Sequence, residues 1–263
     1  MPARDVPTVA LSKGAVMPLL GLGTWQSHGT DAYDAVRSAL DVGYRHVDTA
    51  TMYRNEREVG RAIRESGVPR DQVFVTTKLP PGDADRADEV IQASLRAMEL
   101  DYVDLWLIHW PPGHRASPRT WQRLLDARER GLAREVGVSN YSIEQIDEIQ
   151  RSTGEPPAVN QNEWSPSLFD AEVLGEHERR GVVLEGYSPF KSARLRAEVL
   201  TSVADDHGKS PHQVVLRWHL QHGIVAIPKS THADRIAANF DVLDFELTPA
   251  EMSAIDGLGA SPE

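Results

Sequence analysis

Helical segments alternate with short apolar segments along the whole sequence, and this alternation limits the possible folds more than any other feature. The helical periodicity covers residues 31–42, 56–66, 84–98, 121–130, 143–151, 171–180 and 211–221. The strand-like runs occupy residues 19–22, 46–48, 73–78, 103–109, 135–139, 158–163, 182–186 and 224–228. Strands joined by helices run parallel, and eight of them close into a barrel. The sequence therefore predicts an α/β protein with a (β/α)8 TIM barrel.

Two further features flank the barrel pattern. Residues 6–20 alternate around Ser12-Lys13-Gly14, which predicts a short N-terminal β-hairpin. Two additional C-terminal helices are expected at 233–240 and 249–258. No linker or change in composition divides the series, so we expect residues 1–263 to form a single domain.

Charge and cysteine content exclude several functional classes. The formal net charge of −11 argues against nonspecific attraction to nucleic acid or to anionic membranes. The absence of cysteine excludes disulfides, thiolate catalysis and Cys-ligated metals. No stretch approaches the roughly 20 apolar residues of a membrane span, and the N-terminus lacks an apolar core typical of a signal peptide. A cytoplasmic protein is therefore expected.

Polar residues follow nearly every predicted strand. Barrel enzymes build their active sites at the C-terminal ends of the strands, so these positions are candidates for function. They are Asp48, Lys78, His109, Ser139, Asn140, Gln161, Glu163, Tyr187, Lys229 and Ser230. Helix capping would explain Ser, Asn or Asp at such sites, but not two Lys, a His and a Tyr. The chain has only five Lys, which makes the two at strand ends more notable.

Three of these polar groups, together with Tyr53, suggest proton transfer. Tyr53 follows the strand that ends at Asp48, and its phenol would have an unperturbed pKa of about 10. A nearby Lys78 ammonium would lower that pKa, and Asp48 would hold the ammonium in place. His109 could orient a carbonyl oxygen or share the proton. This set suits protonation of an oxyanion as it forms, but it supplies no electrons.

A cofactor site is suggested near the end of the chain. Residues 21–25 begin like a dinucleotide fingerprint, but Gln26 stands where the third Gly is needed, so a Rossmann fold is rejected. By contrast, Lys229-Ser230 precedes a helix that contains Arg235 and Asn239, which predicts a phosphate site. A capped helix with solvated basic residues is the alternative. The 2′-phosphate of NADP at this site would complement the proton donor, because the cofactor carries hydride.

The motifs resemble those of a known family along nearly the whole chain. They are GLGTW, HVDTATMYRNEREVG, TTKLP, DLWLIHWP, GVSNY, VNQNEWSP, GYSPF and IPKSTHADRIAANF. In this order they resemble the aldo-keto reductases, and especially the short microbial branch that includes 2,5-diketo-D-gluconate reductases. The resemblance implies a monomeric, NADPH-dependent oxidoreductase that reduces aldehydes and small ketones to alcohols.

The resemblance also implies roles for individual residues. Tyr53 would be the general acid, Lys78 would tune it, Asp48 would pair with Lys78, and His109 would position the carbonyl. The implied cofactor contacts are Gly23, Thr24, Ser139, Asn140, Gln161, Tyr187, Ser188, Pro189, Lys229, Ser230, Arg235 and Asn239. Trp25 and Trp110 would line the substrate pocket, and no metal is expected.

The sequence departs from the family pattern in four places. The segment after Tyr187-Ser188-Pro189 is short, Ala238 stands where many members carry Glu, and Trp164-Ser165 replaces a common Tyr-His pair. The chain also stops at Glu263 without the long tail that closes the pocket in many members. We therefore expect an open substrate pocket.

Two alternative functions remain open at this stage. His46 and Asp48 form an H-x-D motif that hints at a metal-dependent barrel hydrolase, with His109 and Glu163 as the other candidate ligands. The second alternative is an NADP-binding sensor or channel-associated subunit on the same barrel. Such proteins carry additional segments for partner contact, which this sequence lacks.

Overall fold

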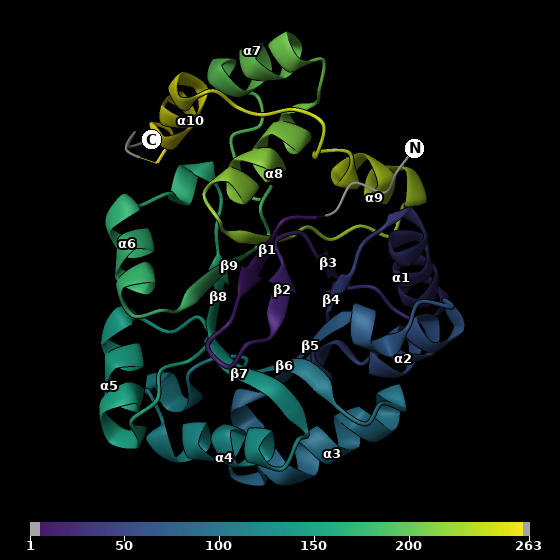
Figure 1. The fold of residues 1–263 in the computed structure, drawn as a ribbon, viewed down its shortest axis with the longest axis vertical. Coiled ribbons are helices and arrows are strands. Elements are labelled where there is room, and N and C mark those ends of the chain that lie inside the picture. Colours follow the sequence, from purple (N-terminus) through teal and green to yellow (C-terminus); the bar gives the residue numbers. More distant parts are fainter. Residues whose placement is uncertain (1–5, 260–263) are drawn as a thin grey trace.

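Residues 6–259 are described by the computed structural model, and eight parallel strands form a nearly closed barrel in this part of the chain (Figure 1). The strands are β3 (Leu22–Gly23), β4 (His46–Asp48), β5 (Phe74–Leu79), β6 (Val103–Ile108), β7 (Ala133–Ser139), β8 (Val159–Glu163), β9 (Val183–Tyr187) and β10 (Val225–Ile227). Each strand pairs with the next one in sequence. The first and last are joined by two bridges, Leu20 to Ala226 and Gly23 to Lys229. The predicted TIM barrel is confirmed.

Helices lie around the outside of this barrel (Figure 1). They are α1 (Thr30–Val42), α2 (Glu56–Glu65), α3 (Ala87–Met98), α4 (Pro118–Glu129), α5 (Ile143–Thr153), α6 (Ala171–Arg179), α7 (Glu198–His207), α8 (Pro211–Gln221), α9 (Ala233–Phe240) and α10 (Pro249–Asp256). Short 3-10 helices are η1 (Thr51–Tyr53), η2 (Arg70–Gln72), η3 (Pro81–Arg86), η4 (Pro112–His114) and η5 (Pro166–Leu168). The helices α5, α8 and α10 each start with a capping box, in which a Ser or Thr hydroxyl accepts a hydrogen bond from the backbone N–H of the third helical residue.

Helix α7 is absent from the sequence prediction, which expected no helix between the strand at 182–186 and the helix at 211–221. Its buried residues Leu200, Val203 and Ala204 follow a helical spacing and lie on one face. Gly208, with φ 62°, ends the helix in the left-handed conformation. The helix packs with α8 and α10 at the top of Figure 1, where a second apolar cluster includes Trp218 and Ile255.

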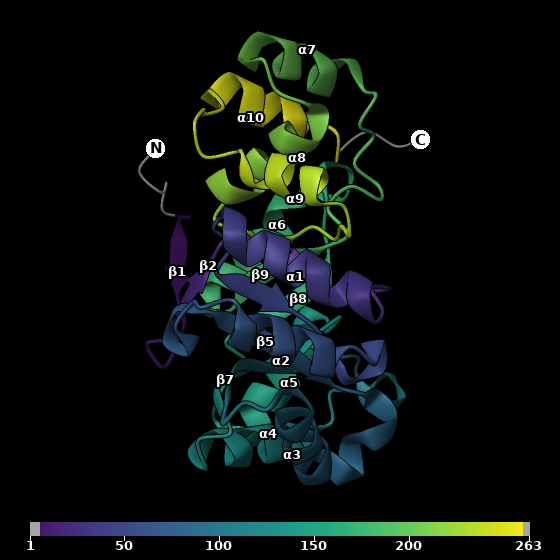
Figure 2. The same cartoon turned by 90° about the vertical axis from the view of Figure 1, so that its right-hand side faces the viewer.

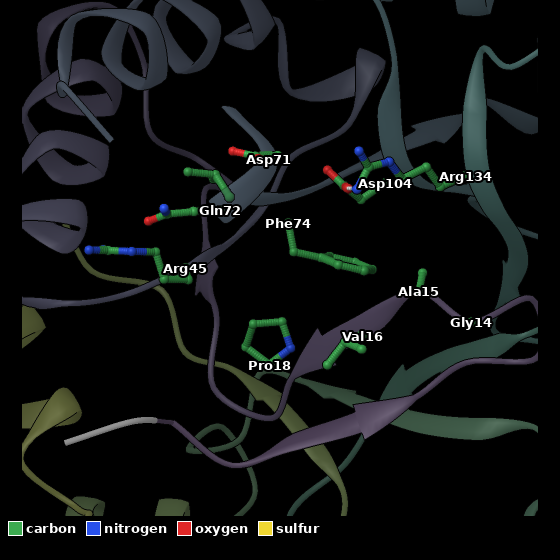
Figure 3. Close-up of a pocket in the computed structure, with 11 residues that line it drawn as sticks. Gly14, Ala15, Val16, Pro18, Arg45, Asp71, Gln72, Phe74, Asp104 and Arg134 are labelled. Atoms are coloured by element: carbon green, nitrogen blue, oxygen red, sulfur yellow. Dashed lines mark ion pairs between the residues drawn. The ribbon is translucent and has the colours of Figure 1, made fainter. Parts of the chain in front are cut away.

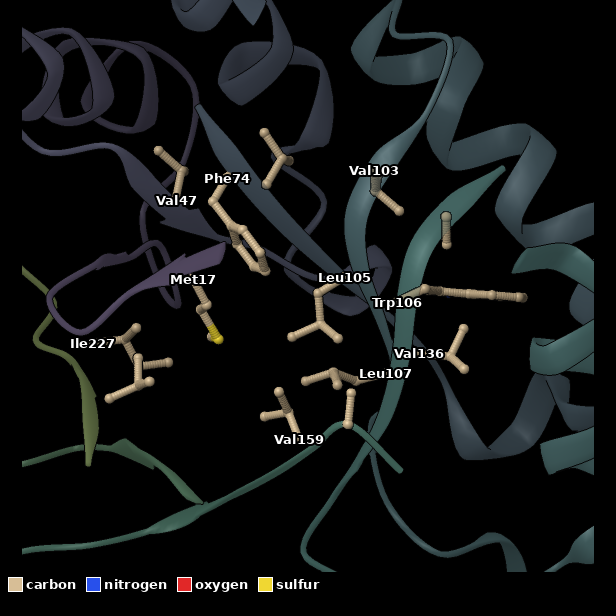
Figure 4. Packing of buried hydrophobic residues seen from close by; sticks show 14 of the residues in the cluster. Met17, Val47, Phe74, Val103, Leu105, Trp106, Leu107, Val136, Val159 and Ile227 are labelled. Carbon is tan, nitrogen blue, oxygen red and sulfur yellow. The ribbon is translucent and has the colours of Figure 1, made fainter. Parts of the chain in front are cut away.

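Side chains of β6 show how the main core is divided between two faces of the sheet. Figure 4 shows Leu105 and Leu107 pointing into the barrel, toward Val159, while Trp106 points outward to the helices. All three β6 side chains are fully buried. This alternation follows from the two-residue period of a strand, and a parallel barrel buries both faces. Trp106 therefore packs between the sheet and the helices that cover it.

The predicted N-terminal hairpin is confirmed as β1 (Thr8–Ala10) paired antiparallel with β2 (Val16–Pro18). It lies across the end of the barrel that faces the viewer in Figure 1 and at the left edge in Figure 2. Met17 points from it into the interior (Figure 4). At its tip, the Lys13 backbone N–H donates to the buried Glu135 carboxylate at 2.7 Å. The hairpin therefore covers the N-terminal end of the barrel, and the opposite, C-terminal end remains for the candidate functional residues.

A hollow of about 290 Å³ lies between this hairpin and the N-terminal ends of the strands (Figure 3). Arg45, Phe74, Asp104 and Arg134 line it, and the last two form an ion pair at 3.4 Å. None of the residues that the sequence predicts to be functional lines this hollow. Among residues 6–259, no helix is both long enough and apolar enough to cross a membrane.

Close packing of α2 against α3 generates a stability prediction. A Cβ at Gly60 would overlap the backbone of Met98. We expect Gly60→Ala to lower the free energy of unfolding by about 1–3 kcal/mol, because the helices must move apart. Alanine's better helix propensity, worth ~0.5–1 kcal/mol, offsets only part of this. Denaturant unfolding measures the change.

The matched control is Gly82→Ala, because a Cβ there meets no atom within 4 Å. Its free energy of unfolding should stay within about 0.5 kcal/mol of the wild type. If Gly60→Ala were as stable as this control, the close approach of α2 and α3 would be wrong.

Candidate active site

Lys78 is the centre of a buried polar cluster at the C-terminal end of the barrel. Its Nζ lies 2.6 and 2.7 Å from the two carboxylate oxygens of Asp48. It also donates to the Thr49 carbonyl at 2.9 Å and lies 3.4 Å from the Tyr53 hydroxyl. The side chain has no solvent exposure. The structure thus brings together Asp48, Tyr53 and Lys78 as the barrel rule predicts.

Local structure explains why these groups converge. Strands β4 and β5 are adjacent, with Asp48 opposite Thr76, so Lys78 lies two residues farther along on the same face. After Asp48 the chain turns into η1, which brings Tyr53 back over the strand ends. A buried ammonium is tolerated only when its donors are satisfied, and here acceptors surround it.

The acidity of Tyr53 differs from the sequence-based expectation. Burial raises the pKa of the Tyr53 phenol, and the opposing effect of the Lys78 charge does not reverse this. For Lys78, burial is the largest effect and acts to lower the pKa, but the charges of Asp48 and Tyr53 and the hydrogen bond to Asp48 together outweigh it, and the pKa is raised. The expected lowering of the Tyr53 pKa is therefore wrong in net direction, because a sequence does not give the extent of burial. Tyr53 is a protonated phenol and Lys78 an ammonium at neutral pH.

His109 lies beside Tyr53 just after β6. The two ring centroids are 5.6 Å apart and the rings meet edge to face, at 75°. Burial, followed by the Lys78 charge, lowers the pKa of His109 to about 3. The imidazole is therefore neutral at neutral pH and carries one N–H donor. Its Nδ1 is buried and has no hydrogen-bond partner among the described residues.

A second group of predicted residues lies at the ends of β7, β8 and β9. Ser139 Oγ donates to the Gln161 carbonyl at 2.7 Å, and Asn140 Nδ2 donates to Ser139 Oγ at 2.9 Å. Tyr187 Oη donates to Asn140 Oδ1 at 2.9 Å. Asn140 takes a left-handed backbone conformation, with φ 60°. These hydrogen bonds fix the polar side chains at the ends of β7 and β9 relative to one another. Asn140 Nδ2 also donates to the His109 carbonyl at 3.3 Å, so this polar group lies next to His109.

Glu185, in the middle of β9, was missed by the sequence analysis. It is fully buried, and its Oε2 accepts from Gln161 Nε2 at 2.9 Å. The same nitrogen donates to Asp48 Oδ2 at 2.9 Å. The Gln161 amide therefore connects Glu185 to the cluster around Lys78. The available signal was a carboxylate inside an otherwise apolar strand of a barrel that buries both strand faces.

Asn55 was also missed, and it fixes the loop that carries Trp25. Its Nδ2 donates to the carbonyls of Thr24 and Ser27 at 2.9 Å each, and its Oδ1 accepts from Thr49 Oγ1 at 2.7 Å. Nothing in the local sequence distinguishes it from an ordinary turn asparagine.

Gly23 and Thr24 lie where the barrel closes. Thr24 Oγ1 donates to the Asp48 carbonyl at 2.9 Å, and a Cβ at Gly23 would come within 2.9 Å of the Ile227 carbonyl. Next to them, Trp25 is 54% exposed, and Trp110 after β6 is 47% exposed. Two large exposed aromatic side chains on strand-end loops offer apolar surface for a substrate.

Cationic residues follow β10. Lys229 and Arg235 are exposed, and neither forms an ion pair with any residue in the described range 6–259. Ser230 Oγ accepts from the His232 N–H at 3.1 Å, and Asn239 is buried on α9. Unpaired cations next to backbone N–H groups can hold a phosphate.

The segment after β9 contacts the neighbouring strand β8. Ser188 has φ 52°, its carbonyl accepts from the Lys191 N–H at 3.1 Å, and Pro189 lies inside this turn. Glu163 at the end of β8 pairs with Lys191 at 3.1 Å. Glu163, one of the candidate ligands of the hydrolase alternative, here bonds a lysine. No group of three or more His, Asp or Glu in the described residues could hold a metal ion.

Comparisons with known proteins point in one direction. Residues 19–260 match the sequence model of the Aldo/keto reductase family. A glyoxal reductase of Bacillus subtilis is 41% identical over 262 residues, covering 98% of this chain and 95% of that protein. The structure superposes on an aldo/keto reductase from Brucella melitensis with a TM-score of 0.93 at 39% identity, covering 97% of this chain and 100% of that one. A Bombyx mori aldo-keto reductase, solved in complex with NADP, gives a TM-score of 0.90 at 35% identity, covering 97% and 93%.

The buried ion pair generates a second stability prediction. Lys78→Met leaves the Asp48 carboxylate buried without a counter-charge, so the free energy of unfolding should fall by about 3–5 kcal/mol. The control is Lys78→Met combined with Asp48→Asn, which removes the orphaned charge and keeps an oxygen for Gln161. Denaturant unfolding should show that the double variant is more stable than the single one. A double variant no more stable than Lys78→Met alone would contradict the pairing.

Proposed function

The chain belongs to the aldo/keto reductase family, and we propose that it is an NADPH-dependent carbonyl reductase that converts aldehydes and small ketones to alcohols. The observation that carries this proposal is the Tyr53 hydroxyl 3.4 Å from the buried Lys78 ammonium, which in turn holds Asp48 at 2.6 Å. A phenol next to a fixed cation at a barrel mouth is a proton donor for an oxygen that gains negative charge.

The residues at the strand ends fit NADPH. Lys229 and Arg235, which have no ion-pair partner within residues 6–259, would hold the 2′-phosphate together with Ser230, and Asn239 would hold the adenine. The remaining contacts would come from Gly23, Thr24, Ser139, Asn140, Gln161, Tyr187, Ser188 and Pro189. When bound, the cofactor supplies the hydride that no side chain can provide. The Bombyx mori structure in complex with NADP supports this choice.

Proton donation in the proposed mechanism comes from Tyr53. Burial keeps the pKa of its phenol raised, so the proton is present at neutral pH when the substrate oxygen needs it. As the proton leaves, negative charge develops on Tyr53 Oη, and the ammonium of Lys78 at 3.4 Å stabilises it. Asp48 keeps that ammonium in place. Lys78 thus acts on the phenolate that forms rather than on the resting phenol.

His109 orients the carbonyl in this proposal. Because its pKa is lowered to about 3, the ring is neutral and does not compete with Tyr53 as the proton source. Its single N–H can donate a hydrogen bond to the substrate oxygen. Trp25 and Trp110, 54% and 47% exposed, would flank the substrate. The similarity to a glyoxal reductase supports small dicarbonyls as members of the substrate class.

We further propose that the protein is a cytoplasmic monomer with a single domain, as the family resemblance implies. We propose no nucleic-acid partner and no protein partner for it.

Removal of the phenol tests the mechanism. Tyr53→Phe should lower kcat for aldehyde reduction about 10²–10⁴-fold, because a general acid contributes this much. NADPH affinity, followed by cofactor fluorescence, should be retained. Tyr102→Phe is the control, because Tyr102 precedes β6 at the other end of the barrel. The assay follows NADPH absorbance with an aromatic aldehyde, a dicarbonyl and a sugar.

Near-wild-type turnover in Tyr53→Phe would overturn the mechanism. A wild-type protein that binds NADPH but reduces none of the substrates would favour the sensor alternative instead.

Cofactor preference tests the phosphate site separately. Arg235→Ala should raise KM for NADPH about 10- to 100-fold, since a hydrogen bond to a charged group is worth ~1.5–3 kcal/mol. KM for NADH should change little, because NADH lacks the 2′-phosphate. Arg151→Ala on α5 is a control for loss of positive charge. Equal losses with both cofactors would place Arg235 away from the phosphate.

A further inference from the structure

Glu185 is a buried carboxyl group that the mechanism above does not use. It lies on β9, opposite Val225 of β10, and has no solvent exposure. Gln161 Nε2 donates one hydrogen bond to Glu185 Oε2 and one to Asp48 Oδ2, at 2.9 Å each. A single amide nitrogen therefore bridges two carboxyl groups, one of which is the partner of Lys78.

The neighbours of Glu185 provide one cation, and that cation is already engaged. From β5, Lys78 directs its hydrogen bonds to Asp48, Thr49 and Tyr53. From β4, His46 Nε2 lies 3.7 Å from Glu185 Oε1, and burial lowers the pKa of His46 to about 3, so this ring is neutral. Among residues 6–259, Asp48 of β4 and Tyr53 of η1 are the other titratable groups that interact with Glu185, while β10 and β3 consist of apolar residues.

This environment favours the uncharged form of Glu185. Burial, and then the charge of Asp48, raise the pKa of Glu185 to about 8. Its Oε1 has no hydrogen-bond partner among the described residues, so no donor is available to stabilise a second carboxylate oxygen. Burial raises the pKa of Asp48 as well, but Lys78 opposes this shift and donates to both Asp48 oxygens, and Gln161 adds a third hydrogen bond. Of the two carboxyl groups, Asp48 is therefore the one that carries the negative charge beside Lys78 at neutral pH.

We propose that Glu185 is a positioning residue for the reductase reaction: it holds the Gln161 amide against Asp48 and, by staying uncharged, leaves Lys78 free to stabilise the Tyr53 phenolate. The kinetic part of this inference rests on the function proposed above. The charge state of Glu185 does not.

Two consequences follow from the geometry. Both hydrogens of Gln161 Nε2 are used by Asp48 and Glu185, so only the amide oxygen of Gln161 remains for a further partner. That partner must be a hydrogen-bond donor, such as the NH2 of a carboxamide. Ionisation of Glu185 at alkaline pH would add negative charge near Tyr53 and disfavour its phenolate. Glu185 therefore extends the pH range over which Tyr53 keeps its proton.

The kinetic test uses Glu185→Gln, which fixes this side chain in an uncharged form. The limb of the pH profile that reports Tyr53 should move to lower pH by about one unit, both for kcat/KM of aldehyde reduction and for alcohol oxidation. The control is Glu56→Gln. Glu56 is also buried and its pKa is also raised by burial, but it bonds Thr77 Oγ1 at 2.6 Å, away from Lys78. The control profile should match that of the wild type.

A second measurement on the wild-type protein needs neither a variant nor turnover. Carbon-13 NMR of protein labelled at the glutamate carboxyl carbon should show one resonance that titrates near pH 8. That resonance should be absent from Glu185→Gln and present in Glu56→Gln.

Two results would overturn the inference. One is the absence of any glutamate that titrates near this pH in the wild type. The other is a lower kcat in Glu185→Gln with an unshifted pH limb, which indicates a structural role alone. Failure of the reductase proposal would show instead in Tyr53→Phe and would leave the carboxyl titration unchanged.

Discussion

The buried ion pair between Lys78 and Asp48 is the interaction on which the rest of the site depends. An ammonium with no solvent exposure is stable only when acceptors surround it, and here they come from Asp48, Thr49 and Tyr53. Those acceptors lie on β4 and on the turn that follows it. The parallel pairing of β4 with β5 therefore fixes both the charge and the position of the phenol.

The sequence alone predicted much of this arrangement. The periodicity of eight strand and helix units placed β4 at the observed residues, His46–Asp48. Because parallel strands present their C-terminal ends to one side, Asp48, Lys78 and His109 were expected at one mouth. Local patterns failed where contacts are distant in sequence. Gln161 and Asp48 are 113 residues apart, and no local signal links either of them to Glu185. Helix α7 was missed because its apolar face is short.

Electrostatics were predicted only in part, because the pKa of a group depends on how deeply the fold buries it. The sequence correctly suggested that Lys78 favours ionisation of Tyr53, but burial outweighs this effect and raises the pKa of the phenol. The difference changes how the proposed mechanism works. A resting phenolate would need to acquire a proton before each reduction, whereas a resting phenol already carries one. Lys78 then contributes when the proton has left, which is where stabilisation accelerates a reaction.

The interior of the barrel is divided between packing and chemistry. Strand β6 sends Leu105 and Leu107 inward, toward Met17 of the hairpin (Figure 4). Strands β4, β5, β8 and β9 instead contribute Asp48, Lys78, Gln161 and Glu185, all buried. Buried polar groups require partners, and these four side chains form hydrogen bonds with one another, but Glu185 Oε1 is buried without a hydrogen-bond partner among the described residues. A carboxyl group that lacks a donor for one oxygen is the member of such a network whose charge is most costly, so protonation is the simplest way for the barrel to accommodate it.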